Sequence, residues 1–190
     1  MKIFSIIFLL LALSSCTTYP HDDGREEYLK KLDHYSAGDK QFSGLYDNFE
    51  FRGTLLTPTI SRIIHNRMAQ IYEWDNQQKQ EHLQKEEEEL QKHTRVWMSF
   101  FTPSSKDDNL DKKTSIWKTY LEVNGSRYEG TAVRSKQILS EAQALFPYHT
   151  RWATIYHLQF PLSSDQVEGQ SAKLIITGPL GRREVVFPGR

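Results

Sequence analysis

One loop of the chain has oxygen-bearing residues at the spacing of a calcium-binding loop. Asp107, Asn109 and Asp111 match the first three ligand positions of that motif, in which alternate side-chain oxygens surround a hard cation. The match then fails, because Lys112 stands where a glycine must make the turn and Lys118 stands where a bidentate glutamate belongs. We therefore predict a solvated loop and no metal site. An irregular calcium site that draws ligands from several loops is the alternative.

A serine and a lysine come nearest to a nucleophilic centre. Ser115 and Lys118 have the Ser-x-x-Lys spacing, but they fall in a stretch whose alternating apolar residues predict a strand. Their side chains would then point to opposite faces. Gly-x-Ser-x-Gly is absent, and none of the seven histidines belongs to a His-Glu-x-x-His run. The sequence thus predicts no catalytic residues and no cofactor.

The single cysteine follows an apolar run at the start of the chain. Residues 3 to 13 are apolar with one serine among them, and Lys2 supplies a positive charge before them. This length is typical of the hydrophobic region of a secretory signal, and it is too short to cross a bilayer, which needs about 20 apolar residues. The run ends in Leu13-Ser14-Ser15-Cys16.

That tetrapeptide resembles the lipobox of bacterial lipoprotein signal peptides: a branched apolar residue, two small residues and an obligatory cysteine. The resemblance implies that residues 1 to 15 are a signal peptide, and that Cys16 carries a diacylglycerol thioether and an acylated amine. Several acyl chains on one residue make an essentially permanent anchor, because a single myristoyl chain binds only marginally. Thr17, in place of an aspartate, implies transfer to the outer membrane. An ordinary cleaved signal with an incidental cysteine is the alternative.

Composition bounds the partners of the chain. Among 190 residues, 24 Lys and Arg balance 24 Asp and Glu. The chain therefore has no electrostatic footprint for nucleic acid. With Cys16 lipidated, no disulfide can form and hydrophobic burial must stabilise the fold. Aromatic residues, 12% of the chain, supply a large area for that burial.

Residues 16 to 44 are polar and predict a lipidated tether. A short amphipathic helix is expected within it, near residues 24 to 36, because apolar residues recur there at helical spacing: Tyr28, Leu29, Leu32 and Tyr35. Two interpretations stay open. The helix docks on the domain that follows, or it lies in a mobile spacer.

A second, longer helical pattern follows. Apolar residues recur at spacings of three and four from Ile60 to Tyr72, and no Pro or Gly interrupts residues 59 to 102. We predict one long helix, or two abutting ones, over about 59 to 93, with its first half packed and its second half solvated. That second half contains four consecutive acids, which predict a solvated face and a candidate partner-binding surface: Glu86, Glu87, Glu88 and Glu89.

Period-two alternation and turn signals predict about seven short strands. Asn124-Gly125 is a strong hairpin signal, and residues 127 to 134 are expected to return as the partner strand. A second hairpin turns at residues 178 to 181, and a short helix is expected within 135 to 146. In the strand expected over 151 to 160, aromatic side chains form a stripe that is most simply core, or alternatively a carbohydrate- or peptide-binding platform: Trp152, Tyr156 and Phe160.

Many short strands joined by turns favour a mainly β fold. We expect an antiparallel β-sandwich, immunoglobulin-like or related, over residues 45 to 190, with one long helix inserted between early strands. We expect the protein to be a lipoprotein of the bacterial cell envelope, held to the membrane through lipid on Cys16. Its domain would be a non-catalytic binding or assembly module with an envelope protein as partner. The alternative is an envelope hydrolase with an unrecognised carboxylate and histidine site.

Overall fold

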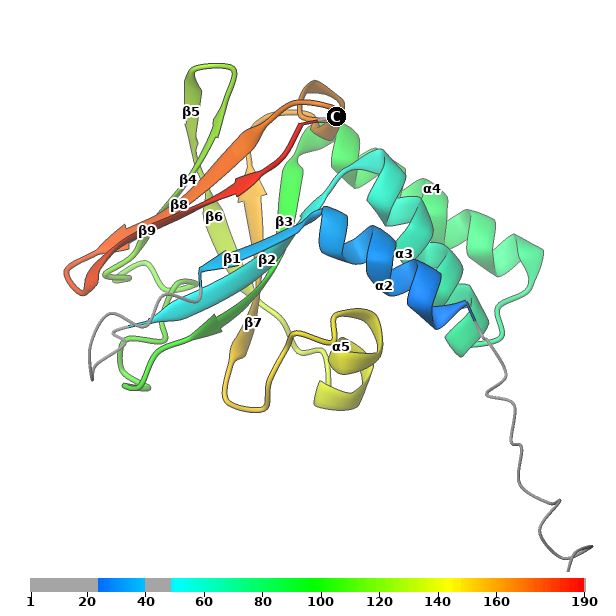
Figure 1. Ribbon diagram of the computed structural model, residues 1–190, viewed down its shortest axis with the longest axis horizontal. Helices are drawn as coiled ribbons and strands as arrows, with labels where there is room; N and C mark the ends of the chain where they lie inside the picture. The colour runs from blue at the N-terminus through cyan, green and yellow to red at the C-terminus, as the bar shows by residue number, and fades with distance from the viewer. Residues whose placement is uncertain (1–23, 40–48, 190) are drawn as a thin grey trace, which may run out of the picture.

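The structure, a computed structural model, describes residues 24–39 and 49–189 and contains two antiparallel sheets (Figure 1). The larger sheet has the strand order β1-β2-β3-β7-β6, and the smaller sheet has the order β5-β4-β8-β9. In chain order the strands are β1 (Ser36–Asp39), β2 (Glu50–Leu56), β3 (Thr94–Phe101), β4 (Lys118–Val123), β5 (Ser126–Glu129), β6 (Thr131–Arg134), β7 (Thr154–Phe160), β8 (Ala172–Gly178) and β9 (Gly181–Phe187).

The two sheets share one core. Alternation along each strand points Phe51, Val96 and Leu158 of the larger sheet into the same buried cluster as Leu121 and Leu174 of the smaller sheet. Burial of each such side chain contributes about 1.5–3 kcal/mol, so this cluster holds the sheets face to face. The prediction of two antiparallel layers, with helical structure inserted between early strands, is confirmed at this level.

The opposite face of the larger sheet is covered by helices (Figure 1). Trp97 and Ile155 point outward from β3 and β7, and they form a second buried cluster with Ile60, Leu90 and Leu145 from three helices. The helices are α2 (Arg25–His34), α3 (Pro58–Ile71), α4 (Asn76–Lys92) and α5 (Leu139–Leu145), with a short 3-10 turn, η1 (Ser164–Gln166).

Of the two forms predicted for residues 59 to 93, the structure has two helices in place of one long helix. The chain reverses after α3, where Glu73 adopts a left-handed conformation with φ 51°, and α4 folds back along α3. A capping box starts α4: the backbone N–H of Gln78 donates to the Asp75 carboxylate at 2.8 Å, and the Gln78 side chain accepts from the Asp75 N–H at 3.0 Å. The polar second half is therefore one arm of a helical hairpin.

The predicted short helix near residues 24 to 36 is present as α2, and it docks on the domain. Tyr28 and Leu32 are buried, and the Tyr28 hydroxyl donates a 2.6 Å hydrogen bond to the Leu145 carbonyl. β1 then pairs antiparallel with β2. Residues 25 to 39, which the sequence alone assigns to the tether, thus contribute a helix and an edge strand to the folded body.

The Asn124-Gly125 hairpin is confirmed, with φ angles of 51° and 78° at the two turn residues. The return strand is not continuous, however, because the chain crosses from one sheet to the other at Gly130 and so divides into β5 and β6. A Cβ at Gly130 would lie 2.4 Å from the Phe160 ring, so only glycine fits this crossing. The hairpin at residues 178 to 181 is also confirmed.

Candidate ligand-binding pocket

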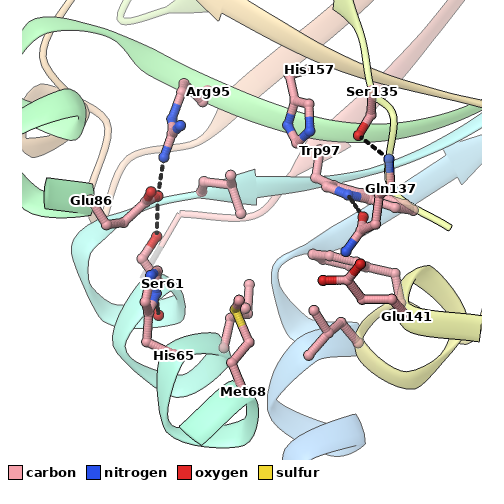
Figure 2. A pocket seen from close by; sticks show the side chains of 14 residues that line it. Ser61, His65, Met68, Glu86, Arg95, Trp97, Ser135, Gln137, Glu141 and His157 are labelled. Atoms are coloured by element: carbon pink, nitrogen blue, oxygen red, sulfur yellow. Dashed lines mark hydrogen bonds and ion pairs between the residues drawn. The ribbon is translucent and has the colours of Figure 1, made fainter. Parts of the chain in front are cut away.

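A pocket of about 400 Å³ lies between the outer face of the larger sheet and the helices α3, α4 and α5 (Figure 2). Strand alternation places Arg95 and Trp97 of β3 and His157 of β7 on this outer face, where Trp97 is the register partner of His157. α3 and α4 cover one side of the site and α5 covers the other. The space between these helices is the pocket.

One wall of the pocket is apolar. The Trp97 indole, 2% exposed, stacks on the Phe146 ring with centroids 3.9 Å apart and planes 14° apart. Its N–H donates to the Gln137 side-chain oxygen at 3.2 Å, which fixes the ring and satisfies its only polar group. Further apolar side chains complete this wall: Leu56, Ile64, Met68 and Leu145.

The opposite end of the pocket is polar and internally paired. Arg95 and Glu86 form an ion pair, with side chains 17% and 16% exposed. The Ser61 hydroxyl donates to the same carboxylate at 3.5 Å. Within the described residues, the Arg95 Nε has no hydrogen-bond partner although it is buried.

Two histidines and one more acid line the same space. The Nδ1 of His65 lies 2.8 Å from the Ser61 carbonyl oxygen, so this nitrogen donates. Burial lowers the pKa of His157, and the positive charge of Arg95 lowers it further. His157 is therefore neutral at pH 7. Glu141 points into the pocket from α5 (Figure 2).

The polar groups of the pocket contact one another. The Glu86 carboxylate is held in an ion pair by the Arg95 guanidinium. The Ser61 hydroxyl points to that carboxylate, and no hydrogen bond joins it to either histidine ring among the contacts of the described residues. A serine needs such a base to become a nucleophile.

The four consecutive acids, predicted as a candidate partner-binding surface, have different neighbours in the structure. Glu86 faces the pocket, whereas Glu87 accepts from Arg62 on α3 at 3.0 Å. Glu88 accepts from the Gln84 side chain at 3.2 Å, and Glu89 pairs with Lys92 at 2.8 Å, which lowers the pKa of Glu89. The helical period separates the four side chains. Glu86 points into the pocket, Glu87 points toward α3, and Glu88 and Glu89 contact residues of α4 itself.

The residues that match a calcium loop have structural roles instead. The Asn109 side-chain oxygen accepts from the Ser115 hydroxyl at 3.3 Å, and the Asp107 carbonyl accepts from the Trp117 indole N–H at 2.6 Å. Lys118 pairs with Glu129, so Ser115 and Lys118 have separate partners. Across residues 24–39 and 49–189, no three His, Cys, Asp or Glu side chains gather as metal ligands.

The acid that organises this loop is Asp108, which no motif marks. Its carboxylate accepts from the Tyr156 hydroxyl at 2.8 Å, from Thr154 at 2.7 Å and from Arg134 at 3.1 Å. Burial and hydrogen bonding to Asp108 raise the pKa of Tyr156. These partners lie far along the chain, so Asp108 joins the loop to β6 and β7.

The aromatic stripe divides into core and surface. Tyr156 and Phe160 are fully buried, but Trp152 is 76% exposed. β7 begins only at Thr154, so Trp152 lies in the preceding turn, outside the alternation that would bury it. Trp152 is thus not core. The predicted lipidation site, Cys16, lies outside the described residues.

No family model, no curated protein and no solved structure matches this chain. Within the part of the chain that the structure describes, no helix has both the length and the apolar character needed to cross a bilayer. Function is therefore inferred from the site and the sequence alone.

Proposed function

We propose that this chain is a lipid-anchored protein of the bacterial envelope, and that its domain binds a ligand without transforming it. The Leu13-Ser14-Ser15-Cys16 signal supports the anchor. The pocket beside Trp97 carries the binding function, because it combines an apolar wall with a paired polar end. Such a pocket is typical of small-molecule sites. The shared core of the two sheets supports an immunoglobulin-like or related sandwich as its scaffold.

The chemistry of the lining indicates a neutral, amphipathic ligand. The Arg95 and Glu86 charges cancel, and Glu141 adds one negative charge. An anionic ligand would meet this acid, whereas an uncharged one loses nothing electrostatically. Its apolar body would pack against Trp97 and Phe146.

Equilibrium dialysis of the purified full-length chain against N-hexylbenzamide, a neutral amphiphile, tests the site. Met68→Trp fills the pocket from α3. Gln70→Trp adds the same ring to an exposed position of the same helix and is the matched control. We expect Met68→Trp to lose the saturable uptake that the native chain and Gln70→Trp retain. Equal uptake by all three would refute the pocket as the binding site. The detergent that carries the lipidated chain also takes up the amphiphile, and it does so equally in all three samples.

The anchor is tested separately. Mass spectrometry of the N-terminal peptide is expected to show a diacylated and N-acylated Cys16. The variant Cys16→Ser should leave the membrane fraction after carbonate washing. An unmodified thiol in the native protein would contradict the lipoprotein assignment.

An envelope hydrolase is the second candidate, because Glu86, His65 and His157 line one pocket. If the site hydrolysed esters, His157→Asn and Glu86→Gln would both abolish turnover of p-nitrophenyl acyl esters by the full-length chain. We expect no turnover by the native chain, since the Ser61 hydroxyl contacts a carboxylate instead of an imidazole.

A further inference from the structure

The turn between α3 and α4 exposes an apolar and aromatic cluster, called here the hairpin tip: Ile71, Tyr72 and Trp74. Ile71 is 38% exposed and Tyr72 is 43% exposed. The Tyr72 and Trp74 rings stack at 5.9 Å, and Trp74 stacks on His82 of α4 at 4.0 Å with planes 6° apart. Stacking fixes the rings at the surface, and the Tyr72 hydroxyl is hydrogen-bonded to Glu141 of α5.

The hairpin tip lies at the end of the domain where the described chain begins. The Leu55 N–H donates to the Tyr35 carbonyl at 2.9 Å, which places the end of α2 beside the end of β2 and hence beside the start of α3. Since α2 packs along α3, the two helices are antiparallel. Residue 25, at the start of α2, is therefore next to the end of α3, as Figure 1 shows.

The length of chain before α2 limits the distance between this end and the lipid. The chain advances eight residues from Cys16 to Gly24. Fully extended, eight residues span at most about 28 Å. A lipid on Cys16 would keep the start of α2, and the hairpin tip beside it, close to the bilayer surface.

We propose that the hairpin tip contacts the headgroup region of the bilayer in which Cys16 is anchored. This inference depends on the proposed lipid anchor. Tyr and Trp favour the membrane–water interface, because one end of each ring system is apolar and the other is polar. Glu73 lies between Tyr72 and Trp74, and Asp75 follows them. These acids would keep the tip at headgroup depth, because charged side chains do not enter hydrocarbon readily.

Site-specific labelling of the full-length lipidated chain tests this contact. Cys16 is the only cysteine and its thiol is taken by lipid, so an introduced cysteine carries the label alone. Ile71→Cys places a bimane on the tip, and Ser126→Cys places it on the exposed β4–β5 turn as the control. Each protein is reconstituted into vesicles of phosphatidylethanolamine and phosphatidylglycerol, with and without brominated acyl chains.

We expect the label at residue 71, and not the label at 126, to shift to shorter wavelength and to be quenched by the brominated lipid. Adding Tyr72→Ser and Trp74→Ser should remove that quenching while the protein still floats with the vesicles. If the chain floats and the residue-71 label behaves like the residue-126 label, the contact is refuted and the anchor stands. If the chain fails to float, the proposed anchor itself fails.

A protein partner gives a different result. In that case the label at residue 71 would be shielded from aqueous iodide but would not be quenched by brominated lipid. Shielding that appears only at high protein density in the vesicles would indicate a second copy of this chain. Either result would overturn the bilayer contact.

Discussion

Replacing Glu86 by glutamine should destabilise the domain far more than the same change at Glu88. Glu86→Gln keeps the shape of the side chain and removes its charge. Arg95 would then be left largely buried without a counter-ion, and its Nε already has no partner among the described residues. Glu88 is exposed and accepts from the Gln84 amide, so Glu88→Gln is the matched control on the same helix.

The size of the effect follows from burial. Removing one partner of a fully buried ion pair costs about 3–5 kcal/mol, because the other charge is left uncompensated. The Arg95 and Glu86 side chains are 17% and 16% exposed, so water partly solvates the charge that is left on Arg95. We therefore expect the free energy of unfolding to fall by about 2–3 kcal/mol. For a chain of this size that corresponds to a fall in Tm of about 4–12 °C. Glu88→Gln should stay within about 0.5 kcal/mol of the native protein.

Urea unfolding of the full-length chain, followed by far-UV circular dichroism, measures these differences as shifts in the midpoint at constant slope. The double variant Glu86→Leu, Arg95→Met adds a second test. Removing both charges together should recover most of the lost stability, since well-packed apolar residues commonly match or exceed a buried pair. If Glu86→Gln unfolds at the same urea concentration as Glu88→Gln, the pair is not buried in the way described.

Three further changes should have measurable effects on the free energy of unfolding. Gly130→Ala would press a Cβ against the Phe160 ring and should cost about 1–3 kcal/mol in urea unfolding. Tyr28→Phe leaves the buried Leu145 carbonyl without its donor and should cost about 1–2 kcal/mol in the same assay. Burial lowers the pKa of His149, so the unfolded chain takes up the proton first. The contribution of His149 to the free energy of unfolding should be full above about pH 6.5. It should fall as the pH drops from there toward the lower pKa of His149 in the folded state. His149→Gln should reduce this dependence on pH.

Local signals predicted the parts of the fold that depend on neighbouring residues. The Asn124-Gly125 turn needs two left-handed residues in succession, and its sequence supplies the pair that tolerates them. The spacing of Tyr28 and Leu32 predicted α2 in the same way, because both face one side of a helix. The sequence left open whether α2 docks on the domain. Docking depends on the Leu145 carbonyl in α5, which lies far along the chain and which no local pattern specifies.

The reversal after α3 was missed because no Gly or Pro marks it. Glu73 adopts the left-handed conformation that usually calls for glycine or asparagine. A signal was nevertheless present, since Asp75 and Gln78 have the spacing of a capping box and so mark a new helix start. The uninterrupted helical pattern of residues 59 to 93 outweighed that signal.

The candidate pocket could not be predicted for a different reason. Glu86 and Arg95 are nine residues apart, and they meet only because α4 ends and β3 starts between them. The apolar wall needs Phe146, which is 49 residues beyond Trp97 along the chain. No periodicity within one element encodes such contacts. Asp108 shows the same limit, because its partner Tyr156 is 48 residues away.

The pocket and the hairpin tip are connected through α3, and this connection links the two proposals. Met68 lines the pocket and Tyr72 belongs to the tip; they are four residues apart and so lie on one face of the helix. Burial and hydrogen bonding to Glu141, which also lines the pocket, raise the pKa of the Tyr72 hydroxyl. A bilayer that receives Tyr72 would therefore lie beside the rim of the pocket, and a neutral amphiphile in the headgroup region would reach Trp97 without first dissolving in water. A pocket lined by Trp97, Phe146, a neutral ion pair and the acid Glu141 suits such a molecule better than it suits an anion, which the aqueous phase would have to deliver.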